Sequence, residues 1–139
     1  MNEKVVVVVD QQDPCGESPM WDARSGRIHW VDIVTATLHT CEWPGTSVHS
    51  FRPGVPVSGI ALTESQSLVL AGSDGVWLWQ DQTALTPIAR ELNGEPLAIN
   101  DCIADERGRL LAGTTFFDGS DSYPLGSLTA WKLTVPSTR

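Results

Sequence analysis

Short runs of β-branched and aromatic residues alternate with polar turn residues along the whole chain, and helical apolar spacing is hard to find anywhere. This pattern predicts an all-β fold. Dipeptides such as Ser25-Gly26 and Asn93-Gly94 separate the runs and suit tight turns, because Gly and Asn tolerate positive φ. The predicted strands are 5–9, 27–32, 37–42, 47–51, 59–62, 67–71, 76–80, 85–90, 101–104, 110–113 and 127–133.

A repeat organises these strands. Three segments share a strand end, a polar turn and a second strand, and Ile28, Leu68 and Leu110 take the same place in each, at steps of 40 and 42 residues. This period is that of a four-stranded propeller blade. The chain is therefore predicted to be a single, partial β-propeller domain over residues 1–139, with material for about three blades.

A propeller normally needs about four to eight blades to close into a ring. Three blades would leave apolar end faces and unpaired strand edges open, which favours aggregation or pairing with another copy. The ending 135–139 follows directly on a predicted strand without a capping element. We therefore expect a truncated propeller, or a chain that assembles with a partner.

Charge and hydropathy exclude several classes of partner. The formal net charge is -8 and no Lys/Arg cluster occurs, so nucleic acid is not an expected partner, whereas a cation or a small neutral ligand is. The only long apolar run, residues 5–9, is too short for a membrane span or a signal-peptide core. We expect no membrane association and a cytoplasmic location.

The cysteines, tryptophans and histidines favour structural roles. Cys15, Cys41 and Cys102 form no C-x-x-C pair and are predicted to be free, buried thiols. Packing between blades accounts for most of the six tryptophans, and a sugar-stacking platform is the alternative. The three histidines have no evident reason to converge, and no Gly-x-Ser-x-Gly motif occurs, so ordinary sheet positions are expected for them.

Two motifs carry candidate chemistry. The first, Cys-Gly-Glu-Ser-Pro-Met-Trp-Asp over residues 15–22, places Glu17 at the entry to a predicted innermost strand, where its carboxylate would suit calcium, magnesium or manganese. A solvated loop glutamate is the alternative. The second is the segment 99–114, in which Asn100 precedes Asp101. An Asn side chain can both accept and donate hydrogen bonds to a hydroxylated ligand, and a simple turn is the alternative.

Both motifs resemble segments of the regucalcin/gluconolactonase (senescence marker protein) family of metal-dependent sugar-lactone hydrolases, which are six-bladed propellers. The resemblance implies that Glu17 is a metal ligand and that Asn100 binds substrate. It also implies a substrate contact for Asp118, after Gly-Thr-Thr-Phe-Phe. The implied cofactor is a divalent cation (calcium, zinc, manganese or magnesium), and the implied small-molecule partner is a sugar lactone.

The spacing of the motifs agrees with the repeat, since the 83 residues from Glu17 to Asn100 make two blades and would place both on inner strands around one axis. The chain departs from the family at Ala98, where many relatives carry an arginine. The family's other metal ligands, an asparagine and the aspartate that is its candidate general base, belong to later blades that this chain lacks. We therefore expect impaired lactonase activity; the alternative is a non-catalytic calcium-binding or self-associating fragment, including a homodimer that completes the propeller.

Overall fold

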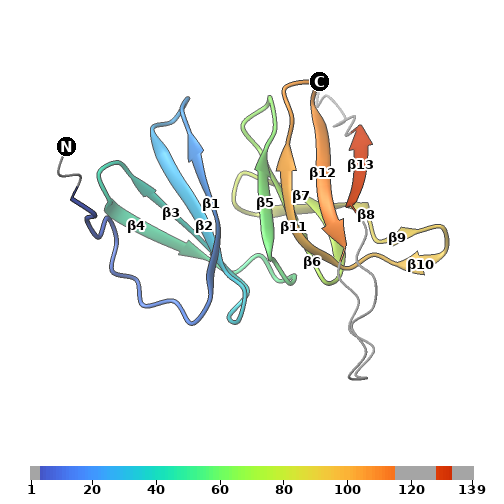
Figure 1. Cartoon of the computed structure of the whole chain (residues 1–139), viewed down its shortest axis with the longest axis horizontal. Coiled ribbons are helices and arrows are strands. Elements are labelled where there is room, and N and C mark those ends of the chain that lie inside the picture. The colour runs from blue at the N-terminus through green and yellow to red at the C-terminus, as the bar shows by residue number, and fades with distance from the viewer. Residues whose placement is uncertain (1–3, 115–127, 133–139) are drawn as a thin grey trace.

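The computed structural model describes residues 4–114 and 128–132, and every regular element in these ranges is a β-strand (Figure 1). The strands form two four-stranded sheets, one three-stranded sheet and one two-stranded sheet. The all-β class predicted from the alternating pattern is therefore confirmed. Across these ranges, no helix has the length and apolar character needed to cross a membrane.

The first sheet contains β1 (Gly16–Asp22), β2 (Arg27–Asp32), β3 (Thr37–Glu42) and β4 (Thr46–Phe51) in sequential antiparallel order. The turn between β3 and β4 requires Gly45 for two reasons. Its φ is +104°, and a Cβ at this position would lie 2.1 Å from the carbonyl oxygen of Val8. The segment before β1 therefore passes directly against one end of this sheet.

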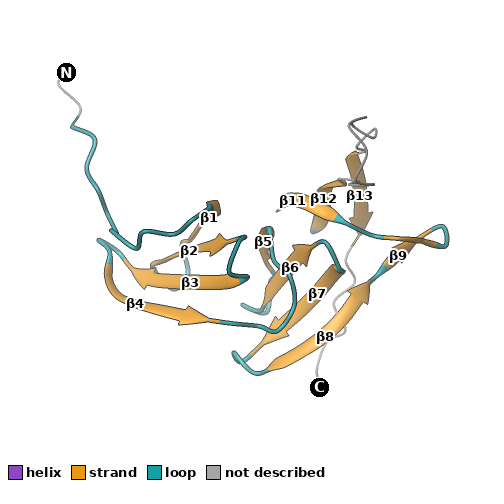
Figure 2. Cartoon of the chain, turned by 90° about the horizontal axis from the view of Figure 1, so that it is seen from below, coloured by secondary structure: helices purple, strands orange, loops and turns teal. Residues whose placement is uncertain are grey.

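The second sheet repeats the same order with β5 (Gly59–Leu62), β6 (Leu68–Gly72), β7 (Gly75–Gln80) and β8 (Ala84–Ala89). A short hairpin of β9 (Glu91–Leu92) and β10 (Glu95–Pro96) follows it. The third sheet contains β11 (Ile99–Ala104), β12 (Arg109–Thr114) and β13 (Leu128–Lys132). In Figure 2 the three larger sheets fan out from β1, β5 and β11, which are the first strands of the sheets.

Two hydrophobic cores join the sheets. Between the first and second sheets lie residues such as Val31, Leu38 and Leu70, and between the second and third lie residues such as Val69, Ile99 and Leu110. The second sheet is thus covered on both faces, and every residue of β6 is buried. This double coverage explains why β6 is continuously apolar, whereas β4, at an outer edge, is largely exposed.

Close contacts hold the first strands together. The Ile60 amide donates a hydrogen bond to Ser18 Oγ at 3.1 Å, which links β5 to β1, and Ser58 Oγ donates to the Ile99 carbonyl at 2.8 Å, which links the second sheet to β11. A Cβ on Gly59 would lie only 2.7 Å from the Cys102 backbone nitrogen. The absence of a side chain at Gly59 therefore permits the approach of β5 to β11.

The predicted repeat appears as three similar hairpins. Ile28 pairs with Trp21, Leu68 with Leu62 and Leu110 with Ala104, each beside the turn that joins the first two strands of its sheet. The number of blades and the closure of a ring stay predictions.

The prediction of a strand over residues 5–9 is wrong, because residues 4–13 form no strand and Val5 and Val7 are 101% and 81% exposed. Valine favours strands through packing against neighbouring strands, and in the part of the chain described here this segment pairs with none. The expected strands also omit β1 altogether. Its Gly-Glu-Ser-Pro start has a turn-like composition, and Ser18 has a φ of +52° at a register irregularity.

Candidate functional site

Glu17 lies near the start of β1 and is exposed. It lines a pocket of 350 Å³ between the first sheet and the segment that precedes it, together with Gln11, Gln12, Asp13 and Trp30. Its carboxylate has no hydrogen bond or ion pair with any other residue that the structure describes. Glu17 therefore presents a free anionic group to a solvent-accessible pocket.

Asp32 fixes the backbone just before Glu17. This buried carboxylate accepts hydrogen bonds from the Cys15 amide at 3.1 Å, the Val34 amide at 3.2 Å and the Thr35 hydroxyl. The Thr35 hydrogen bond is the main reason that the pKa of Asp32 lies below its usual range, so the carboxylate stays charged at neutral pH. Asp32 thus holds the chain that carries Glu17 against the end of β2.

Asp13 anchors the other wall of the pocket. Its carboxylate accepts a hydrogen bond from Trp30 Nε1 at 2.7 Å, and its second oxygen lies 3.3 Å from His39 Nε2. The Trp30 and His39 rings stack at 5.1 Å between centroids, and His39 Nδ1 lies 2.8 Å from Ser50 Oγ. This network is buried around His39, so it secures the segment before β1 and leaves little of Asp13 for a ligand.

Asn100 is the second residue of β11, as Glu17 is the second residue of β1. Gly16 pairs with Asp32 and Glu17 pairs with Val31, and the register irregularity of β1 comes after Glu17. Ile99 pairs with Thr114, and Asn100 lies within the register irregularity of β11. Glu17 directly follows Gly16, and Asn100 directly follows Ile99. The strands β1 and β11 run in the same direction (Figure 1). Both residues therefore lie at the same end of the sheets, although Asn100 does not line the Glu17 pocket.

Asp118, the third predicted site residue, lies outside the described residues. Asp13, Asp32 and Ser58 position the site but were not among the residues predicted from the sequence or from the resemblance. The spacing Asp32-x-x-Thr35 was a usable signal, because an Asp side chain commonly bonds to backbone and hydroxyl groups two or three residues later. Nothing local marks Ser58, which reaches a strand 41 residues away.

The described residues do not by themselves fit a metal ion. They contain no group of three or more His, Cys, Asp or Glu side chains that could hold one. The Glu17 pocket offers one free carboxylate and the amide oxygens of Gln11 and Gln12. Calcium prefers about six to eight oxygen ligands, so a complete site needs ligands from beyond these residues.

The cysteines agree with the prediction of free thiols. Cys15, Cys41 and Cys102 form no disulfide, and the last two are buried. Burial raises the pKa of the Cys102 thiol to about 12, and the nearby Asp101 carboxylate acts in the same direction. Such a thiol stays protonated at neutral pH and is a poor nucleophile.

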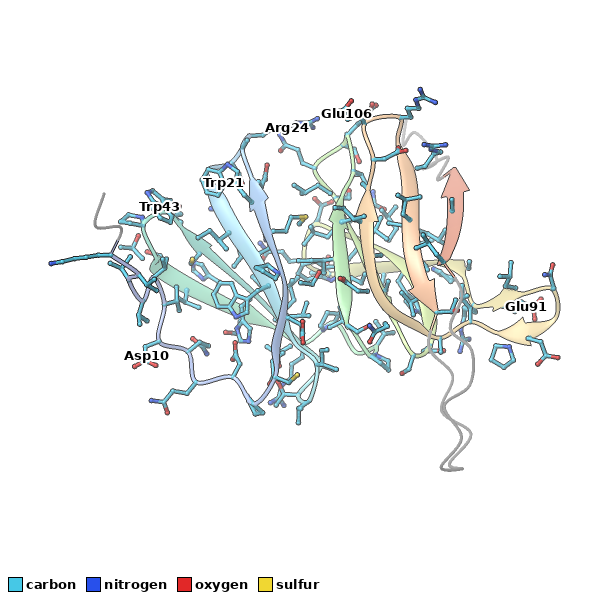
Figure 3. All side chains as sticks on the ribbon, viewed as in Figure 1. Asp10, Trp21, Arg24, Trp43, Glu91 and Glu106 are labelled. Carbon is cyan, nitrogen blue, oxygen red and sulfur yellow. The ribbon has the colours of Figure 1, made fainter. Side chains whose placement is uncertain are left out.

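The tryptophans only partly follow the packing prediction. Trp79 is buried between the first and second sheets and contacts Phe51 edge to face. Trp21 and Trp43 are 53% and 60% exposed and lie on the outer side of the first sheet (Figure 3). Packing between the described sheets therefore does not explain these two side chains.

Comparison with known proteins assigns the fold to a family. Residues 15–139 match the family model described as the SMP-30/Gluconolactonase/LRE-like region. The chain is 35% identical to regucalcin of Xenopus laevis over 116 residues, which cover 80% of the chain and 38% of that protein. It is 31% identical to Bacillus subtilis YvrE, whose name marks it as a candidate sugar lactone lactonase, over 82% of the chain and 40% of YvrE.

A solved structure with the same fold is that of Agrobacterium tumefaciens regucalcin, described as a calcium-binding protein. It matches with a TM-score of 0.70 and 22% identity, over 90% of this chain and 45% of its own. The class of protein is therefore an all-β chain with a propeller-like sheet arrangement. More particularly, the chain belongs to the SMP-30/gluconolactonase family, and it spans about two fifths of the length of the curated relatives it matches.

Proposed function

We propose that this chain supplies part of the active site of a metal-dependent sugar-lactone hydrolase. The observation that carries the proposal is the free carboxylate of Glu17, exposed in a 350 Å³ pocket at the same sheet end as Asn100. A bound divalent cation would polarise the lactone carbonyl and lower the pKa of water. Glu17 is a suitable oxygen ligand for calcium, magnesium, manganese or zinc.

The remaining roles follow from the chemistry of the side chains. Asn100 can donate to one hydroxyl of a sugar lactone and accept from another, which would orient the ring. Asp118 is proposed as a further contact to sugar hydroxyls. Ala98 lies two residues before Asn100 and carries no charge, so discrimination among lactones would rest on other groups. The general base and further ligands are proposed to come from outside the described residues.

An isolated chain is proposed to be a weak catalyst at most, because the one free carboxylate that the described residues bring to this pocket cannot complete a metal site. Assembly with a second copy is the second candidate function. It is favoured by large apolar side chains that stay exposed on the two outermost sheets: Trp21 is 53%, Ile103 65% and Leu128 80% exposed. If two copies packed these exposed faces against each other, their sheets together would complete a closed ring.

The test is hydrolysis of a panel of aldonolactones by the purified chain, with calcium, magnesium, manganese or zinc added in turn. Glu17→Ala should remove the metal-dependent rate. Glu106→Ala is the matched control, because this exposed glutamate lies at the opposite end of the sheets (Figure 3) and should leave the rate unchanged. Sedimentation velocity on the same sample measures self-association.

Metal-dependent turnover that Glu17→Ala abolishes would support the lactonase proposal. If turnover accompanies a dimer, the second copy completes the site. A rate that survives Glu17→Ala, or a folded dimer without turnover at any metal, would remove Glu17 from the proposed role and favour a binding function.

A further inference from the structure

A second cavity lies between the first and second sheets, away from Glu17. Its volume is 240 Å³, and its walls include His29 and Thr40 from the first sheet and Trp79 from the second. Residues of the turns that follow β1, β5 and β7 also line it, whereas Glu17 lies at the start of β1. The cavity is therefore at the opposite end of the sheets from the proposed lactone site.

The cavity contains buried polar atoms that lack partners. His29 is 9% exposed and Thr40 is 6% exposed. Neither ring nitrogen of His29, nor Thr40 Oγ1, has a hydrogen-bond partner in the described ranges. Buried polar side-chain atoms are nearly always paired, so three such atoms in one cavity offer unused hydrogen-bonding capacity to a polar ligand.

The charges around the cavity disfavour an anionic ligand, because the carboxylates of Asp22 and Asp81 both line it. Asp22 is buried, and its carboxylate already accepts hydrogen bonds from the Ser25 hydroxyl and from the Arg24 amide at 3.0 Å. Burial raises the pKa of Asp22, but these hydrogen bonds outweigh it and keep the carboxylate charged. Arg27 is paired with Glu42 at 3.5 Å, so it is only partly available to an anion. Among the described residues, no metal-binding group of three ligands forms here.

The hydrogen-bonding capacity of the cavity matches hydroxyl groups. Burial lowers the pKa of His29, which keeps the ring neutral with one donor and one acceptor nitrogen. The Thr40 hydroxyl also donates and accepts. The rings of Phe51 and Trp79, 5.4 Å apart between centroids, supply an apolar wall for the carbon skeleton of a ligand.

We propose that this cavity binds a small polyol of three or four carbons through hydroxyl contacts to His29 and Thr40. A polyol satisfies the orphaned atoms without adding charge, and its C–H groups face the aromatic wall. An apolar molecule of the same size would leave those atoms unpaired. The site is independent of Glu17, so it stands or fails separately from the lactonase proposal.

The test is a titration of the isotopically labelled chain with erythritol, followed by NMR of the His29 imidazole and of the backbone amides. We expect saturable shifts at His29 and around Thr40, and none of this kind with 1-propanol. Thr40→Val, which removes the hydroxyl at nearly constant volume, should weaken binding about fivefold to tenfold. Thr86→Val, at an exposed position of β8, is the matched control and should bind like the wild type.

Shifts that grow linearly without saturation would mean that water alone fills the cavity, and they would overturn the proposal. Equal binding by Thr40→Val and wild type would also overturn it. Binding lost in Glu17→Ala and retained in Thr40→Val would place the polyol in the other pocket. The backbone amide spectrum of each variant establishes that it is folded, and His29→Gln offers a second variant should Thr40→Val fail to fold.

Discussion

Gly59→Ala should destabilise the chain by forcing β5 away from β11. The added Cβ would lie 2.7 Å from the Cys102 nitrogen and 3.1 Å from two backbone atoms of Asp101, whereas ordinary contact begins at 3.4 Å. These are backbone atoms of a paired strand and cannot rotate away as a side chain can. Asp101 follows Asn100 directly, so the same displacement would move the predicted substrate residue relative to Glu17.

Gly113→Ala is a matched control for the magnitude. A Cβ on Gly113 would meet no atom of the described residues within 4 Å, and neither glycine has a positive φ. Both substitutions reduce the conformational freedom of the unfolded chain, which stabilises by about 0.4–1 kcal/mol. Because that contribution is common to both, their difference measures the steric cost at Gly59, which should be about 1–3 kcal/mol.

The assay is urea-induced unfolding followed by tryptophan fluorescence, with the free energy of unfolding compared between the two variants at equal m-value. The expected order is Gly113→Ala at or above wild type and Gly59→Ala below it. If both variants have the same free energy of unfolding, the close packing of β5 on β11 is not a stability determinant, and the reasoning is refuted.

Three further outcomes follow from the buried polar groups. Ser58→Ala should lower the free energy of unfolding by about 1–3 kcal/mol in the same assay, because it leaves the Ile99 carbonyl without its hydroxyl partner. A loss below about 0.5 kcal/mol, which is the level of ordinary surface substitutions, would contradict this prediction. Burial lowers the pKa of His29 from its ordinary 6.5, so the unfolded chain binds a proton that the folded chain does not. Stability should therefore fall as the pH decreases below about 6.5, and His29→Gln should flatten that slope in unfolding measurements at several pH values. Iodoacetamide at pH 8 should label partly exposed Cys15 well before buried Cys102, as peptide mass spectrometry would detect; equal native-state rates would contradict the raised thiol pKa of about 12.

The alternating pattern and the repeat were sufficient to predict most of the strands, because each sheet is a sequential antiparallel meander whose partners are close in sequence. The segment 5–9 failed for the complementary reason. Its valines satisfy every local criterion for a strand, but strand formation also requires a neighbour, and neighbours are a property of the whole fold.

For the candidate site, the repeat could predict only the place of two residues along their strands. The spacing of 83 residues predicted equivalent points of two sheets for Glu17 and Asn100, and both lie near the start of the first strand of a sheet. The groups that position the site were not predictable in this way. Asp13 meets Trp30 across 17 residues, and Ser58 meets Ile99 across 41, so both contacts depend on how sheets and segments pack.

The double coverage of the second sheet has a consequence for how the chain can be divided. A sheet that is apolar on both faces is insoluble in water until it has two neighbours, so removal of either flanking sheet would expose one of the two cores. The three sheets should consequently unfold as one cooperative unit, and no cut between them would yield an autonomous module. We therefore expect no domain boundary within residues 16–114, even though each sheet is a separate, contiguous stretch of sequence.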